Sequence, residues 1–174
     1  MNDMAYIMVD IEADGSIPSD YSMISFAAVV VKAGLNQSFF AELKPISENW
    51  IPEALAVSGY TREQTLLFDE PLLVMQRFAD WLSGLNEKVF FISDNNGFDW
   101  QFINWYFHHF LKHNPFGHSS TNLGSLFKGI ERDMFKNFKH LRKTAHTHHP
   151  LDDAKGNAEA LLAIKELYGL KIKL

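Results

Sequence analysis

Two acidic residues, Asp10 and Glu12, stand two positions apart in an otherwise apolar segment near the start of the chain. In a β-strand, side chains at positions i and i+2 point to the same face, so a strand here places both carboxylates side by side. Crowded carboxylates repel each other and are costly to bury without a compensating cation. Hard divalent ions such as Mg²⁺ or Mn²⁺ prefer oxygen ligands. The pair therefore indicates a metal site, although a solvated strand end is the commoner explanation of an isolated Asp-x-Glu.

Two further acids, Asp99 and Asp153, come near the starts of predicted helices, where the helix dipole also favours acidic side chains. His148 precedes Asp153 by five residues, within the run His146-Thr147-His148-His149. A histidine beside an attacking water can act as a general base; a solvent-exposed loop histidine is the alternative. No cysteine and no HExxH pair is present to favour zinc. Acids at the ends of three elements predict a site at the edge of a sheet.

The elements that must position these residues follow from apolar patterning. Strands are expected at 4–12, 22–32, 36–43 and 88–93, and helices at 52–57, 71–83, 98–112 and 151–167. The first three strands are joined by short links and so predict an antiparallel meander. The order of elements indicates one α/β or α+β domain over residues 1–174, with helices packed on a mixed sheet.

Three segments resemble sequence motifs of a known family. Asp10-Ile11-Glu12-Ala13-Asp14-Gly15 is similar to D-x-E-x-x-G, and Asn95 to Phe102 (NNGFDWQF) is similar to N-x-x-F-D-x-x-F. His148 to Asp153 is similar to H-x-x-x-x-D. Together they resemble the DEDDh superfamily of DnaQ-like or RNase T-like 3′–5′ exonucleases. The resemblance runs from about residue 5 to residue 167.

The resemblance implies an RNase H-like fold with a five-stranded mixed sheet. It implies two Mg²⁺ or Mn²⁺ ions held by Asp10, Glu12, Asp99 and Asp153, with His148 as the general base. Such a site would release nucleoside 5′-monophosphates from the 3′ end of a nucleic acid. The short chain suggests a stand-alone exoribonuclease, so RNA is favoured over DNA as the substrate.

Two positions depart from the family pattern. Asp14 stands where many members carry threonine, so an extra acid is expected to crowd the first motif. Ser58 stands where some members place a histidine near the terminal nucleotide, which makes it a candidate substrate contact. Asp94 and Asp152 lie close to the motif acids but do not match the motif spacing.

Further candidate substrate contacts come from two segments. Basic residues recur every three or four positions over residues 128–143, which predicts one basic helical face that includes Lys136 and Lys139. This face would guide the phosphate backbone, or would simply be the solvated side of an amphipathic helix. The aromatic helix at 98–112 offers rings for base stacking. Most of these rings are expected to pack against the sheet, with Phe102 the best candidate to face a nucleotide.

The overall composition limits the remaining possibilities. The chain has a net charge of −5 and no cysteine, and no stretch approaches the ~20 apolar residues of a membrane span. The protein is expected to be cytoplasmic, without a membrane partner, and a homodimer by family resemblance. Three alternatives stay open: an exodeoxyribonuclease acting on single-stranded DNA or 3′ overhangs, a catalytically silent nucleic-acid-binding module, and a phosphohydrolase for small nucleotides.

Overall fold

The computed structural model describes residues 4–173. The strands are β1 (Met4–Ala13), β2 (Met23–Val30), β3 (Ser38–Glu42), β4 (Lys88–Ser93) and β5 (Ser120–Asn122). The α-helices are α1 (Pro52–Val57), α2 (Arg62–Thr65), α3 (Pro71–Gly84), α4 (Asn96–Tyr106), α5 (Leu123–Glu131) and α6 (Pro150–Tyr168). A π-helical turn, η1 (Phe107–Leu111), extends α4, and a 3₁₀ turn, η2 (Lys139–Leu141), precedes α6. Within these described residues, no helix combines the length and the apolar character needed to cross a membrane.

The five strands form one mixed sheet in the order β3-β2-β1-β4-β5. β1, β2 and β3 pair antiparallel, as the meander predicted, whereas β4 is parallel to both β1 and β5. This arrangement confirms the expected RNase H-like fold. The ladder between β1 and β4 ends at the pair Met8 and Ile92, although β1 continues to Ala13. The last part of β1 therefore extends beyond the end of β4.

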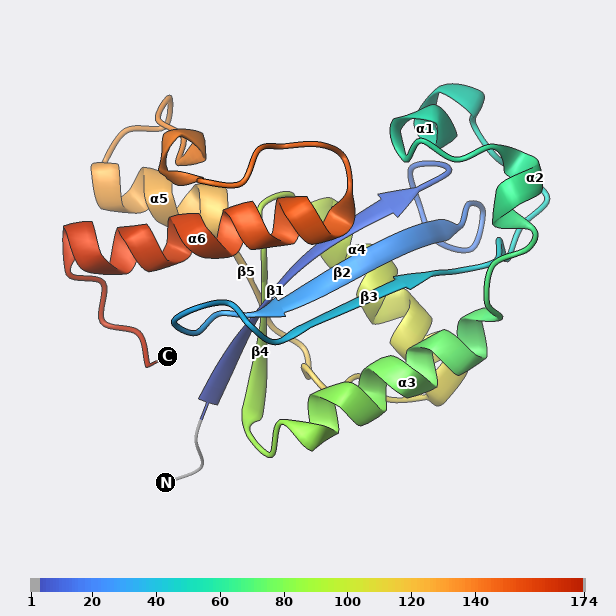
Figure 1. Cartoon of the computed structure of the whole chain (residues 1–174), viewed down its shortest axis with the longest axis horizontal. Helices are drawn as coiled ribbons and strands as arrows, with labels where there is room; N and C mark the ends of the chain where they lie inside the picture. Colours follow the sequence, from blue (N-terminus) through green and yellow to red (C-terminus); the bar gives the residue numbers. More distant parts are fainter. Residues whose placement is uncertain (1–3, 174) are drawn as a thin grey trace.

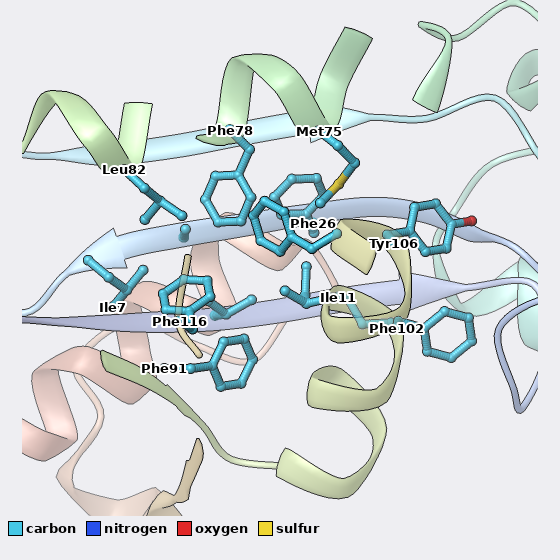
Figure 2. Close-up of a cluster of buried hydrophobic side chains, with 14 of the residues drawn as sticks. Ile7, Ile11, Phe26, Met75, Phe78, Leu82, Phe91, Phe102, Tyr106 and Phe116 are labelled. Carbon is cyan, nitrogen blue, oxygen red and sulfur yellow. The ribbon is translucent and has the colours of Figure 1, made fainter. Parts of the chain in front are cut away.

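Helices cover both faces of the sheet (Figure 1). One face packs against α3 and α4 through a core rich in phenylalanine, which includes Phe26, Phe78 and Phe91 (Figure 2). The other face packs against α5 and α6 through mostly aliphatic side chains. Alternation along β1 sends Ile7, Val9 and Ile11 into the first core and Met8 into the second. Asp10 and Glu12 lie two and four residues after Met8, so their side chains point to the same face of the sheet, the face covered by α6.

The basic segment 128–143 is not the single helix that its spacing predicted. α5 ends at Glu131, and Arg132 adopts a left-handed conformation with φ of 55°. Phe127 and Phe138 are both buried in one core cluster, with ring centroids 6.5 Å apart. In a continuous helix these residues would lie about 16 Å apart along the axis. Burial of Phe138 therefore folds the segment back on itself and breaks up the predicted basic face.

Candidate active site

Asp10 and Glu12 lie on the part of β1 that extends beyond β4. Their cross-strand partners on β2 are the small residues Ala27 and Ser25. Small partners leave space above the sheet for two carboxylates and for the α6 helix that crosses this face. The first motif therefore places both acids side by side, as the strand periodicity predicted.

Asp99 reaches the same region from α4. The chain leaves β4 at Ser93 and enters α4 at Asn96, which places Asp99 in the first turn of the helix. Burial raises the pKa of its carboxyl group, and the nearby Ser93 hydroxyl and Ile11 amide partly offset this effect. Asp99 is only 2% exposed, and its Oδ2 atom is buried without a hydrogen-bond partner. A buried carboxylate oxygen without a donor is costly unless a cation binds it.

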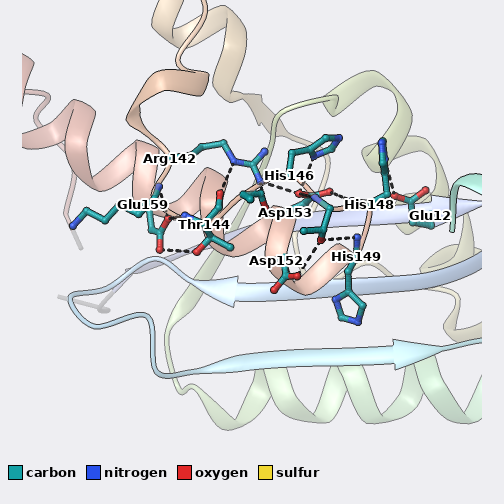
Figure 3. A network of polar contacts seen from close by, with 12 residues as sticks. Glu12, Arg142, Thr144, His146, His148, His149, Asp152, Asp153 and Glu159 are labelled. Atoms are coloured by element: carbon teal, nitrogen blue, oxygen red, sulfur yellow. Dashed lines mark hydrogen bonds and ion pairs between the residues drawn. The ribbon is translucent and has the colours of Figure 1, made fainter. Parts of the chain in front are cut away.

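Asp153, in the first turn of α6, is the most heavily bonded of the acids (Figure 3). Its Oδ1 atom lies 2.8 Å from Arg142 Nη2 and 2.8 Å from His146 Nδ1. The Thr147 amide donates to Oδ1 at 3.2 Å, and the His148 amide donates to Oδ2 at 3.1 Å. The carboxylate therefore fixes the loop that leads into its own helix.

His148 occupies a left-handed backbone conformation with φ of 61°. This conformation, which histidine adopts more readily than most residues, directs the His148 amide toward Asp153. The imidazole, whose side chain is 52% exposed, has its Nδ1 atom 3.9 Å from Glu12 Oε1. The histidine thus stands at the solvent side of the acidic group.

All five motif residues line or border one cavity of about 250 Å³. Oxygen atoms of Asp10, Glu12 and Asp153 lie within 4.8 Å of one another, a spacing that suits a shared metal ion. The cavity lining comprises Asp10, Ile11, Glu12, Asp94, Asn95, Phe98, Asp99, Lys139, Arg142, His146, His148 and Asn157. Asp153 contacts three of these residues directly, namely Arg142, His146 and His148.

The electrostatics of the cavity favour a bound cation. Burial, together with the charges of Asp99 and Asp153, raises the pKa of Asp10 well above its ordinary value. Burial raises the pKa of Glu12 to about 7 and that of Asp99 to about 8. Raised pKa values mean that the ionised carboxylates are short of compensating charge. Together with the unbonded Asp99 oxygen, this all-oxygen donor set fits hard divalent ions.

Three residues of the site were not predicted from the sequence. Arg142, whose side chain is 8% exposed, is the buried countercharge of Asp153. Its position in a run of basic residues gave no signal that distinguished it from its neighbours. His146 bonds Asp153, and Asn157 lines the cavity with its Oδ1 atom buried and without a hydrogen-bond partner. Asn157 lies one helical turn after Asp153, and this spacing was the available signal.

The predicted substrate contacts have mixed outcomes. The prediction for Phe102 is wrong: its ring is fully buried in the phenylalanine-rich core, because it lies one turn further along α4 than the cavity. Phe98, which contacts the Phe102 ring edge-on, lines the cavity instead. Lys139 also lines the cavity, whereas Lys136 lies in the exposed turn before η2. Ser58 donates its hydroxyl to the Leu55 carbonyl and lies outside the cavity lining.

Asp14 does not crowd the acids of the first motif. Its side chain is fully buried, and its Oδ2 atom lies 2.8 Å from Arg62 Nη1. Its Oδ1 atom accepts the Ser22 amide. The following residue must be glycine, because a Cβ atom on Gly15 would overlap the Tyr21 ring. Asp14 therefore fastens the loop after β1 to α2.

The loop that carries His146 and His148 is also fastened at its start. Glu159 on α6 accepts the amides of Lys143 and Thr144, at 2.8 and 2.7 Å, and the Thr144 hydroxyl at 2.9 Å. Gly156, between Asp153 and Glu159 on the same helix, lets Arg142 and the Thr144 carbonyl lie directly against the helix backbone. Contacts at both ends thus hold the loop across α6.

The comparisons with known proteins agree with this geometry. The exonuclease family model RNase_T matches residues 7–161, so the chain belongs to this exonuclease family. This match and the fold identify the chain as a metal-dependent 3′–5′ exonuclease of the DEDDh superfamily, as the motifs predicted.

Particular relatives are similar over nearly the whole chain. The 3′–5′ DNA exonuclease Cap18 of Escherichia coli is 34% identical over 173 residues, which cover 93% of this chain and 92% of the relative. The nuclease domain of 3′hExo, a DEDDh family member solved bound to rAMP, has a TM-score of 0.74 at 16% identity, covering 98% of this chain and 96% of that chain. Escherichia coli Exonuclease I with a dT13 oligonucleotide has a TM-score of 0.74 at 15% identity, covering 93% and 41%.

Proposed function

We propose that this exonuclease degrades DNA from the 3′ end, with Asp10, Glu12, Asp99 and Asp153 as the ligands of two divalent ions. The DNA assignment is supported by the 34% identity with a 3′–5′ DNA exonuclease over 93% of the chain. The ligand assignment is supported by the convergence of the four acids, one of them with an unbonded buried oxygen.

The chain's own residues divide the work of hydrolysis. Bound divalent ions would activate the attacking water and stabilise the charge that develops on the leaving oxygen. His148, at the solvent side of the acids, would take the proton of that water. Arg142 holds Asp153 in its ligand orientation, because the guanidinium supplies a charged hydrogen bond to Oδ1. Lys139 at the cavity wall would attract the phosphate backbone.

The preference for an RNA substrate, which the sequence analysis favoured, stays a prediction. It is the alternative that a substrate assay must distinguish from DNA. The fold neighbours include a nuclease domain bound to rAMP and a nuclease bound to dT13. The carboxylates would hold metal ions at the phosphodiester and would not contact the sugar, so they are compatible with DNA or RNA. A preference would rest on contacts to the 2′-hydroxyl.

An end-label assay tests the proposal. DNA and RNA oligonucleotides of one sequence, labelled at the 5′ end, are incubated with Mg²⁺, Mn²⁺ or EDTA. We expect a ladder shortened from the 3′ end on DNA, no cleavage in EDTA, and slower cleavage of RNA. Faster cleavage of RNA would reject the DNA assignment. Hydrolysis of mononucleotides in preference to oligonucleotides would identify a small-nucleotide phosphohydrolase instead.

Two variants with a matched control test the residue roles. Asp153→Asn should abolish cleavage, because the amide removes the charge of a ligand. Asp152→Asn is the control, since Asp152 bonds the Thr147 hydroxyl and does not line the cavity. His148→Asn should reduce cleavage by ~10²-fold or more, the contribution of a general base. Asparagine also accepts the left-handed backbone, so normal activity of this variant would remove His148 from the base role.

Homodimer formation and a cytoplasmic location also stay predictions. The aromatic rings of α4 are mostly packed in the core, so they do not support an interface there. Exposed leucines directly after α2 and in the first turn of α3 are the alternative candidates for an interface: Leu66, Leu67, Leu72 and Leu73. Light scattering on wild-type protein and on a Leu67→Ser, Leu73→Ser variant would test whether these leucines form a dimer interface.

A further inference from the structure

A second group of metal-ligating atoms lies beside the acidic group. One donor atom from each of His146, His148 and Asp153 lies within 4.8 Å of the others. The two imidazole rings meet edge to face, with centroids 4.3 Å apart. Of this group, only Asp153 also belongs to the all-oxygen group formed with Asp10 and Glu12.

The two groups differ in the ions they suit. Carboxylate oxygens suit Mg²⁺ and Mn²⁺, whereas imidazole nitrogens suit Zn²⁺ and similar transition metals. Two imidazoles and one carboxylate are a common protein ligand set for Zn²⁺. We propose that His146, His148 and Asp153 form a Zn²⁺ site that inhibits the exonuclease.

The loop is arranged so that the site is partly preformed and open to solvent. The side chains of His146 and His148 are 53% and 52% exposed, so an ion can reach them. Asp153 fixes the backbone between them through the Thr147 and His148 amides. Glu159 fixes the start of the same loop. Binding would therefore require adjustment of two side chains, not ordering of the loop.

Inhibition follows from the shared residues, and this part of the inference rests on the proposed function. A Zn²⁺ ion bound to the His148 imidazole withdraws the lone pair that would accept the proton of the attacking water. The same ion would also bind the Asp153 carboxylate, which the all-oxygen group needs to hold its own ions. Zn²⁺ at this site should thus slow the chemical step without requiring displacement of the nucleic acid.

Metal binding can be measured without any catalysis. Wild-type protein free of Mg²⁺ is titrated with Co²⁺, a spectroscopic substitute for Zn²⁺, and the visible absorption is recorded. Zn²⁺ is then added to displace the bound Co²⁺. We expect saturable absorption from a nitrogen-ligated ion, lost on addition of Zn²⁺. His146→Gln should weaken binding about tenfold or more, as loss of one ligand of three implies. His149→Gln is the matched control, because His149 stacks on Phe40 and lies outside the group.

Cleavage assays then test inhibition. The Zn²⁺ concentration for half-inhibition at fixed Mg²⁺ is measured for each protein, relative to its own zinc-free rate. We expect the value to rise about tenfold in His146→Gln and to stay unchanged in His149→Gln. Equal inhibition of wild-type protein and His146→Gln would overturn the inference, because Zn²⁺ would then act at the carboxylates alone.

The two arms separate the inference from the proposed function. Co²⁺ binding that depends on His146, in a protein without exonuclease activity on DNA or RNA, would retain the site and reject the function. Exonuclease activity in a protein whose Co²⁺ absorption is absent, or is unchanged by His146→Gln, would retain the function and reject the site.

Discussion

Substitution of Gly156 by alanine tests whether the loop before α6 must lie directly against that helix. Gly156 lies within α6, where alanine normally stabilises a helix by about 1 kcal/mol relative to glycine. Here the added Cβ atom would overlap Arg142 Nε and would lie 2.7 Å from Arg142 Nη2 and 2.8 Å from the Thr144 carbonyl oxygen. The carbonyl belongs to a backbone that Glu159 holds, so it cannot move freely.

Gly156→Ala is therefore expected to lower the unfolding free energy, although helix propensity alone would raise it. Overpacking in a close-packed region costs about 1–3 kcal/mol. After subtraction of the propensity gain, Gly156→Ala should lower the unfolding free energy by up to about 2 kcal/mol. Displacement of Arg142 also frees Asp153 from its charged partner, so kcat should fall about tenfold, as for a residue that orients a metal ligand.

Gly129 provides the matched control. It lies in α5, is exposed, and has nothing within 4 Å of the position that a Cβ atom would occupy. Gly129→Ala should raise stability by up to about 1 kcal/mol and leave kcat unchanged. Urea unfolding and end-label cleavage measure both quantities. If Gly156→Ala raises the unfolding free energy as much as Gly129→Ala does and leaves kcat unchanged, the close packing of Arg142 against α6 is refuted.

Three further predictions concern the acids and their partners. In EDTA, the unfolding free energy should fall as pH rises from about 5 to 8. The raised pKa values of Glu12 (about 7) and Asp99 (about 8) mean that the folded state binds more protons than the unfolded chain over this range. Urea unfolding that shows rising stability from about pH 5 to 8 would contradict this prediction. Arg62→Met should destabilise the protein by about 3 kcal/mol, since it leaves the Asp14 carboxylate buried without its cation; the matched Arg77→Met, at an exposed pair with Asp69, should change stability by less than about 1 kcal/mol. Glu159→Gln should speed amide hydrogen exchange in residues 143–148 and lower kcat with the fold intact; unchanged exchange would show that the loop is held by Asp153 alone.

The parts of the fold that the sequence predicted are those with strong local patterning. β1 and β4 are apolar runs, α3 begins with proline, and α6 has acidic residues in its first turn, so their positions agree with the expectation to within a residue or two. β5 was not predicted, because its three residues are polar and become a strand only by pairing with β4. The break after α5 was likewise hidden, since it depends on Phe138 packing against Phe127.

The same distinction applies to the site. The motif acids could be found because fixed spacings along β1, α4 and α6 place them at element ends. Arg142 and His146 could not, because their contacts with Asp153 depend on the path of an irregular loop. Phe102 shows the opposite error: its spacing from Asp99 suggested proximity to substrate, but the helix turns it into the core.

The dense bonding of Asp153 has a consequence for protein engineering. Asp10 and Glu12 depend on regular strand geometry, so this pair can be transplanted onto another scaffold with a single strand. Asp153 cannot, because its orientation is shared with Arg142, with two amides of the preceding loop and, through that loop, with Glu159. Residues 142–159 therefore form a single cassette, and a designer who borrows this half of the site must move the loop and the helix together.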